Sequence, residues 1–303
     1  MESILVLFQQ LVIMAVYCLI GAALHKTGLV GRDGCRAFSR LLLYVILPCV
    51  IVNSFLQERT PEVTVQLLLS GGASVLLLAL SMALSRLLLR KQPVEEFSAS
   101  FSNAGFMGIP LITMALGGDA VVYIVPFVAL LNILQWTYGQ NLLLGNKQTS
   151  LRGVLLNPLV LALAAGIVLY ALPLTLPELL RRPVSALAAC NSPVAMIILG
   201  CYLAEIPLHQ VFTEKSAWRV SLLRLLVIPA VSALALAWLP ALGAEAKTAL
   251  IIAAGAPVGI NVAVYAELLG RDYKKSVILI CHSSVLCLLT MPLIQLLMQA
   301  LLR

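Results

Sequence analysis

The chain has 303 residues, of which 61% are hydrophobic and only 11% are charged, and its mean hydropathy is +1.02. A soluble domain carries about 25% charged residues, because its surface must be hydrated. The composition therefore excludes a soluble enzyme and a disordered chain. It also excludes a nucleic-acid-binding protein, because the excess of 20 basic over 13 acidic residues forms no contiguous basic patch. An integral membrane protein that binds no nucleic acid is predicted.

Ten apolar stretches are predicted to form transmembrane helices, and at about 30 residues for each span with its loop they use the whole chain. Their continuous Leu- and Ala-rich runs lack the alternating pattern of a transmembrane β-barrel. The first span follows Glu2 rather than basic residues, so we expect it to be retained and not cleaved as a signal peptide. The predicted spans lie near residues 3–24, 36–56, 63–88, 97–117, 120–144, 157–173, 183–204, 217–239, 246–269 and 275–301.

Basic residues are distributed unevenly among the predicted connections. Placing the N-terminus outside puts 15 of the 20 Lys and Arg residues, Arg224 among them, at cytoplasmic helix ends. The positive-inside rule therefore predicts a multi-pass protein of the cell (inner) membrane with both termini outside. Arg181 and Arg182 are the local exception.

The seven cysteines give no sign of a disulfide framework or a metal site. Their number is odd, most lie inside apolar stretches, and none are spaced as C-x-x-C. We interpret them as small hydrophobic side chains. Neither a cofactor nor a metal is predicted.

Two similar turns indicate an internal repeat. Leu-Gly-Gly-Asp at 116–119 and Leu-Gly-Arg-Asp at 269–272 lie 153 residues apart. Because each half holds five helices, the second half must cross the membrane in the opposite sense. We predict repeats at 1–145 and 157–303, joined by a cytoplasmic linker at 146–156, and we interpret both aspartates as helix N-caps.

The fourth and ninth spans are each interrupted near their middle by one Pro, two Gly and one Asn, at 102–110 and 255–261. Pro removes a backbone donor, and Gly costs about 1 kcal/mol relative to Ala inside a helix. We predict two broken, crossing helices whose unpaired backbone groups face protein or a watery cavity. Each second half would begin there with roughly +0.5 of an elementary charge, so that the two N-termini attract an anion.

Small residues spaced four apart, at 104 and 108 and at 255 and 259, would let the broken helices cross closely. Asn103 and Asn261 either bind a carboxylate or only satisfy the freed backbone. Asn53 and Asn191, next to prolines of the second and seventh spans, either line the other side of a substrate or belong to packing kinks. The candidate substrate-binding residues are Asn53, Asn103, Gly105, Gly108, Pro110, Asn191, Pro257, Gly259 and Asn261.

Two ionisable residues are candidates for coupling or gating. We expect Glu267 to be the acid nearest the crossing, because it lies ten residues after Pro257. It is either a proton-linked gate or an interfacial glutamate whose carboxylate reaches solvent. His282 either titrates near neutral pH or is a buried, neutral histidine with a hydrogen-bond partner.

At these motifs the sequence resembles the auxin efflux carrier family, which includes plant auxin exporters and bacterial relatives. Asn-Ala-Gly-Phe-Met-Gly-Ile-Pro-Leu at 103–111 resembles the family's fourth-helix crossover, and Ala-Pro-Val-Gly-Ile at 256–260 resembles its ninth-helix crossover. The likeness extends to 191–193 and 199–200. It implies an all-α membrane fold of ten helices, a five-plus-five inverted repeat with crossed, broken helices 4 and 9, like bile-acid symporters and sodium–proton antiporters.

The resemblance also implies a scaffold of helices 1, 2, 6 and 7, a transport domain of helices 3–5 and 8–10, an elevator-type movement and a homodimer through the scaffold. It implies that Asn103 faces a carboxylate. Only residues 145–156 separate the halves, so the long cytoplasmic loop of many plant members is missing. That points to a bacterial-type carrier and makes auxin a doubtful substrate.

The predicted function is a secondary carrier that exports or exchanges small organic anions, such as malate, malonate or auxin-like carboxylates. Its predicted partners are that anion and the lipid bilayer. The alternative is a sodium- or proton-coupled organic anion symporter of the bile-acid-carrier type, against which the missing crossover carboxylates speak. An enzyme is excluded, because no G-x-S-x-G, H-E-x-x-H or paired intramembrane Asp occurs. A receptor or channel is not excluded by the sequence.

Overall fold

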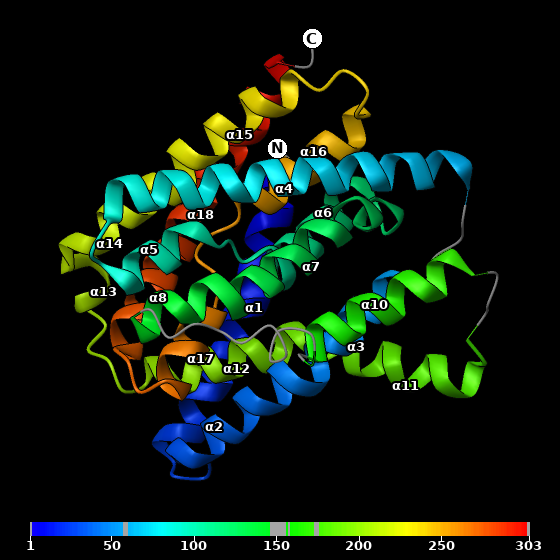
Figure 1. Ribbon diagram of the computed structural model, residues 1–303. Coiled ribbons are helices and arrows are strands. Elements are labelled where there is room, and N and C mark those ends of the chain that lie inside the picture. The colour runs from blue at the N-terminus through cyan, green and yellow to red at the C-terminus, as the bar shows by residue number, and fades with distance from the viewer. Residues whose placement is uncertain (1, 57–59, 146–155, 157, 173–175, 302–303) are drawn as a thin grey trace.

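The computed structural model describes residues 2–56, 60–145, 156, 158–172 and 176–301, and the regular secondary structure in this part of the chain is helical apart from one isolated β-bridge (Figure 1). Many helices are continued by short π-helical or 3-10 segments, labelled η. The first half contains α1 (Glu2–Lys26), α2 (Arg32–Leu41), η1 (Leu42–Ile46), α3 (Leu47–Ser54), α4 (Pro61–Leu89), α5 (Pro93–Ser100), η2 (Ala104–Gly108), α6 (Ile109–Leu116), η3 (Asp119–Ile124), α7 (Val125–Leu134), η4 (Gln135–Gly139) and α8 (Gln140–Leu144).

The second half follows a similar order of elements. It contains α10 (Pro158–Ala171), α11 (Glu178–Ala189), α12 (Asn191–Leu203), α13 (Gln210–Thr213), α14 (Lys215–Leu222), η5 (Leu223–Val227), α15 (Ile228–Ala237), α16 (Ala244–Gly255), α17 (Asn261–Leu268) and α18 (Tyr273–Leu301). These helices lie within a few residues of the predicted ranges, so hydropathy alone locates them.

Six helical stretches of the described residues are long and apolar enough to cross a membrane. The prediction of an all-helical membrane protein is therefore confirmed. In the first and sixth predicted spans, the apolar helices are shorter, at Val12–Lys26 within α1 and Pro158–Ala171 in α10. The six long stretches are Arg32–Ser54, Pro61–Leu89, Asp119–Leu144, Glu178–Leu203, Lys215–Ala237 and Tyr273–Leu301.

Local sequence sets several helix ends. Thr60 caps α4, because its side chain accepts a hydrogen bond from the Val63 N–H at 3.1 Å. Asp272 caps α18 in the same way, accepting from the Lys275 N–H at 3.0 Å, as predicted. The prediction is wrong for Asp119, which lies inside the first turn of η3 and makes no cap bond. Gly117 ends α6 with φ of 97°, a conformation that only Gly adopts without strain.

For description, the helices are divided into two groups according to some of their main contacts. In the first group, α1 packs along α12, and α3 packs against both α10 and α11. In the second group, α4 packs on α5 and α7, while α18 contacts α14, α15 and α17. Figure 1 shows α3, α10 and α11 together at one end of the molecule and α4 along the opposite edge. The polar cavities described below lie where the groups meet.

Two glycines let α1 and α12 approach closely. A Cβ added to Gly200 would overlap the backbone carbonyl of Cys18, and one added to Gly21 would overlap the carbonyl of Ile197. Neither backbone carbonyl can move aside without displacing its helix. This pair is thus joined by backbone contact, as small residues allow in membrane proteins.

Replacing Gly200 with Ala should lower the stability of the purified protein by roughly 1–3 kcal/mol, the usual cost of overpacking. Thermal unfolding in detergent measures this. Gly72→Ala is the matched control, because Gly72 lies in α4 with nothing within 4 Å of an added Cβ, and it should unfold at the wild-type temperature or slightly above. Equal melting of the two variants would contradict the close α1–α12 contact.

Candidate functional site

The two helices predicted to break are interrupted at the centre of the protein. In the first, α5 ends at Ser100 and helical structure resumes at Ala104. In the second, α16 ends at Gly255 and α17 begins at Asn261. The interruptions contain extended backbone, with φ and ψ of −122° and 120° at Phe101 and of −61° and 152° at Ala256.

Backbone groups at each interruption form hydrogen bonds with backbone groups at the other. Ser102 and Val258 form an antiparallel β-bridge. The Asn103 N–H donates to the Pro257 carbonyl at 2.7 Å, and the Gly259 N–H donates to the Phe101 carbonyl at 3.1 Å. Backbone groups that a continuous helix would pair internally are thus paired between the two halves of the chain, which meets the demand of an apolar environment.

Four helix ends therefore meet at one place. The first halves, α5 and α16, present their C-terminal carbonyls. The second halves, the continuous helix Ala104–Leu116 and α17, present first-turn N–H groups and the positive ends of their dipoles. The two N-termini are the part of this arrangement that is predicted to attract an anion.

A narrow pocket of about 10 Å³, room for about one water molecule, lies beside the crossing. Buried oxygen atoms of Ser102, Asn103 and Asn261 have no hydrogen-bond partner in the described part of the chain. Polar atoms so placed call for a polar ligand or water. The lining consists of Leu47, Ser102, Asn103, Gly105, Phe106, Leu131, Asn132, Gln135, Gly259 and Asn261.

Two residues of this pocket were missed by the sequence reasoning. The Asn261 side-chain amide donates to Gln135 Oε1 at 2.8 Å and to Asn132 Oδ1 at 3.2 Å. Asn132 and Gln135 lie three residues apart in a mostly apolar span, and that spacing places them on one helix face. These amides, two of four side-chain amides in the span, were the available signal, because polar side chains in membrane helices usually face protein or a polar cavity.

A larger cavity of about 410 Å³ lies next to the narrow pocket, and Gly105 lines both. Asn53 and Asn191 also line it, so the structure brings both beside the crossing. Ser185 donates to Asn53 Oδ1 at 2.7 Å, and the Asn191 amide lies 3.5 Å from the Gly105 carbonyl. The lining comprises Val50, Asn53, Ser54, Gly105, Ile109, Gly118, Val121, Ser185, Ala188, Ala189, Asn191 and Ser192, none of them charged.

Three other candidates contribute backbone or packing. Gly108 lies in the lining of neither pocket, and an added Cβ would stand 3.6 Å from the Ala253 backbone. Pro257 supplies its carbonyl to Asn103. Pro110 lies in α6, and its side chain is outside the described residues. Gly255 faces Met291 of α18, so the predicted pairing of 255 with 259 in the crossing contact is wrong.

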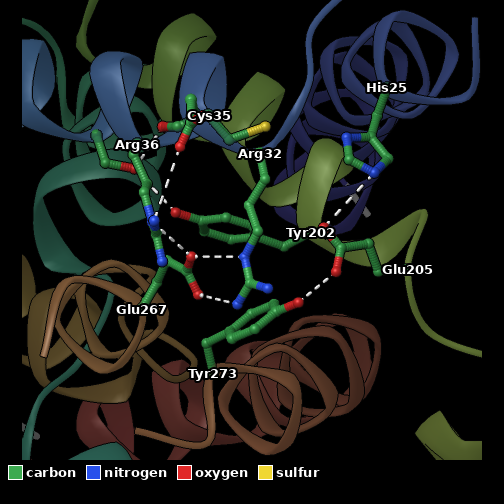
Figure 2. A network of polar contacts seen from close by, with 10 residues as sticks. His25, Arg32, Cys35, Arg36, Tyr202, Glu205, Glu267 and Tyr273 are labelled. Atoms are coloured by element: carbon green, nitrogen blue, oxygen red, sulfur yellow. Dashed lines mark hydrogen bonds and ion pairs between the residues drawn. The ribbon is translucent and has the colours of Figure 1, made fainter. Parts of the chain in front are cut away.

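Glu267 is buried between two arginines (Figure 2). Its Oε1 lies 3.0 Å from Arg32 Nε and 2.9 Å from Arg36 Nε, and Arg32 Nη2 reaches the other oxygen at 3.3 Å. The glutamate is 3% exposed. The interpretation that its carboxylate reaches solvent is therefore wrong, because this bidentate pairing holds it inside.

The same polar network extends to a second acid (Figure 2). Tyr273 donates to Glu205, and His25 Nε2 lies 3.5 Å from the same carboxylate. The Arg32 guanidinium lies 5.2 Å from the centre of the Tyr273 ring. Figure 2 shows these side chains converging from α1, α2, the end of α12, α17 and α18, so the network joins both helix groups.

His282 lies away from both pockets. It is fully buried in α18, its Nδ1 is 2.7 Å from Ser221 Oγ, and its ring packs against Trp218 at 4.6 Å. This geometry favours the interpretation as a buried, hydrogen-bonded histidine.

Two further acids near the crossing along the chain were overlooked. Glu95 and Glu96 lie in the first turn of α5, eight and seven residues before Asn103. Both are buried and paired: Glu95 with Arg219 at 3.1 Å and Lys275 at 2.7 Å, and Glu96 with Arg86 at 3.2 Å. They line neither pocket, so the candidate site stays free of carboxylates.

Comparison with known proteins decides the family. The model of a family described as membrane transport protein matches residues 6–153 and again residues 147–295. The chain belongs to the auxin efflux carrier family of membrane transport proteins. The two successive matches also support the internal repeat, and membership excludes an enzyme.

One curated relative is a Rhizobium meliloti (strain 1021) protein named "Putative malonate transporter". It is 29% identical over 192 residues, which are 57% of this chain and 59% of the relative. This chain thus aligns with somewhat more than half of that protein's length.

Gly259→Ala should disrupt the crossing, because an added Cβ would lie 3.0 Å from the Ser102 carbonyl oxygen and 3.3 Å from that of Phe101. We expect a loss of roughly 1–3 kcal/mol, read by thermal unfolding. Gly255→Ala is the control, since its Cβ would meet only the Met291 and Ile294 side chains at 3.5 Å or more. If both variants were equally stable, the close backbone contact would be disproved.

Proposed function

We propose that this protein is a carrier that exports or exchanges small carboxylates. The observation that carries the proposal is the meeting of two helix N-termini, at Ala104 and Asn261, beside amide- and hydroxyl-lined pockets without an acidic residue. Two N-termini supply roughly one positive charge and several free N–H groups. A carboxylate provides the matching charge and acceptors.

Alternating access would come from movement of one helix group against the other. The proposed scaffold consists of α1, α2, α3, α10, α11 and α12. The proposed transport unit consists of α4 to α8 and α14 to α18. The larger cavity takes Asn53 and Asn191 from the scaffold and Gly105 and Gly118 from the transport unit. Polar contacts between the units at this place are long, such as 3.3 Å from Ser192 Oγ to the Phe106 carbonyl, and suit an interface that slides.

In this scheme the Glu267 network is the gate at the other end of the pathway. Glu267 belongs to the transport unit, whereas Arg32 and Arg36 belong to the scaffold. With the N-terminus outside, this network lies at the cytoplasmic end, and the cavity at Asn53 and Gly118 faces outward. We further propose both termini outside and a location in the cell (inner) membrane; a homodimer through the scaffold stays a prediction.

The substrate class follows from the pocket chemistry and from the relative. Amides and hydroxyls hydrogen-bond a carboxylate, and the larger cavity of about 410 Å³ has the volume of a site for small molecules. The matched relative carries malonate in its name. We therefore propose a small mono- or dicarboxylate, with malonate as the first compound to test.

Asn103→Ala should weaken carboxylate transport at least tenfold, because a buried polar group facing the substrate is lost. Purified protein in liposomes loaded with unlabelled malonate is tested for uptake of labelled malonate, and saturable counterflow distinguishes a carrier from a channel. Asn141→Ala, in α8 and outside both linings, is the control. Wild-type affinity in Asn103→Ala would remove this residue from the site.

The same liposomes test the sodium- or proton-coupled alternative. Three unpartnered buried oxygens near the crossing are ligands of the kind that sodium binds, so this alternative has a structural basis. Uptake should persist when choline replaces sodium and when no pH gradient is imposed. Strict dependence on either ion would replace the uncoupled carrier by the symporter.

Glu267→Gln should open the gate, because the two arginines lose their shared anion. Hydrogen–deuterium exchange should rise severalfold in peptides covering 30–38 and 264–274 and fall around Asn53, as one end opens and the other closes. Glu178→Gln is the control, since its pair with Arg182 is exposed. Increased exchange at both ends would indicate simple destabilisation and contradict the gate.

A further inference from the structure

Arg224 is the largest polar side chain buried beside the crossing. It lies in η5 and is only 1% exposed, although the charge count of the sequence places it at a cytoplasmic helix end. It forms no ion pair with a carboxylate in the described part of the chain. An unpaired cation at such a place is costly and marks a functional position.

Its partners are the C-terminal ends of both broken helices. Nη1 donates to the carbonyls of Ala99 and Ser100, at 3.0 and 3.4 Å, at the end of α5. Nη2 donates to the carbonyl of Ala254, at the end of α16. Ser81 Oγ accepts from Nη1 at 3.1 Å and itself donates to Ser100 at 2.7 Å. One guanidinium thus spans two helix ends.

The charges at the crossing can be added up. Each first half ends with roughly −0.5 of an elementary charge and each second half begins with roughly +0.5, so the four ends alone sum to about zero. Arg224 adds a full positive charge at the negative ends. The crossing is thereby left with a net charge of about +1, carried by the two N-termini at Ala104 and Asn261.

We propose that Arg224 is the residue that makes the crossing selective for anions. This assignment rests on the proposed function and deepens it. Arg224 acts as a positioning residue: it neutralises the C-terminal ends of α5 and α16 and fixes them side by side, so that the opposite N-terminal ends present an uncompensated positive field to the substrate. The planar fork of Arg allows both contacts at once, which the single ammonium of Lys cannot reproduce.

The test measures how affinity depends on ligand charge. Binding of malonamide, malonamate and malonate, which carry zero, one and two negative charges at neutral pH, is compared by isothermal titration in detergent. Arg224→Gln should weaken binding by on the order of 10-fold for each negative charge of the ligand and leave malonamide unchanged. Arg219→Gln removes a positive charge from the same helix, where the exposed Arg219 side chain pairs with Glu95, and should preserve the wild-type order of affinities.

A merely structural role predicts a different pattern. If Arg224→Gln weakens all three ligands by one factor, or keeps the charge dependence, the assignment is overturned. If Arg224→Gln fails to fold, Arg224→Lys is measured instead. The proposal predicts that Arg224→Lys binds the charged ligands more weakly but keeps the wild-type order of affinities among the three ligands. Loss of that order in Arg224→Lys would contradict the proposal. A wild-type protein with no preference for charged ligands would instead overturn the proposed function, and the selectivity assigned to Arg224 with it.

Discussion

Two backbone hydrogen bonds, from Asn103 to Pro257 and from Gly259 to Phe101, are the contacts on which the rest of the structure depends. A membrane interior leaves no unpaired N–H or C=O without a large cost, so two helices can break only where each completes the other. Once they are paired, the four helix ends are fixed in space. The pockets, the amides that line them and the position of Arg224 all follow from that crossing.

Charge is kept out of the pockets and concentrated around them. Glu267 is paired with two arginines, and the acids of α5 are paired with basic residues at its N-terminal end. The polar side chains that line the two cavities are amides and hydroxyls only. Such a site binds a charged ligand through dipoles and hydrogen bonds, and it has no charged side chain that must be dehydrated when the substrate enters or leaves.

Hydropathy and helix breakers were sufficient to predict the helices, both interruptions and the amides at Asn103 and Asn261, because these depend on residues close together in the chain. The side-chain contacts between different helices could not be predicted from the sequence. That Asn261 meets Gln135 of another helix, or that Glu267 is enclosed by Arg32, depends on how helices pack. Arg224 shows the limit most clearly: counted by position as a helix-end charge, it is buried against backbone carbonyls far along the sequence.

The crossing also bears on how the protein is made. Synthesis proceeds from the N-terminus, so Phe101, Ser102 and Asn103 are complete more than 150 residues before Pro257 and Gly259 exist. Until then the break in the fourth helix has no partner for its backbone. The first half must therefore wait with this segment shielded by water, by another protein or by a provisional helix, and the fold closes only when its ninth helix arrives.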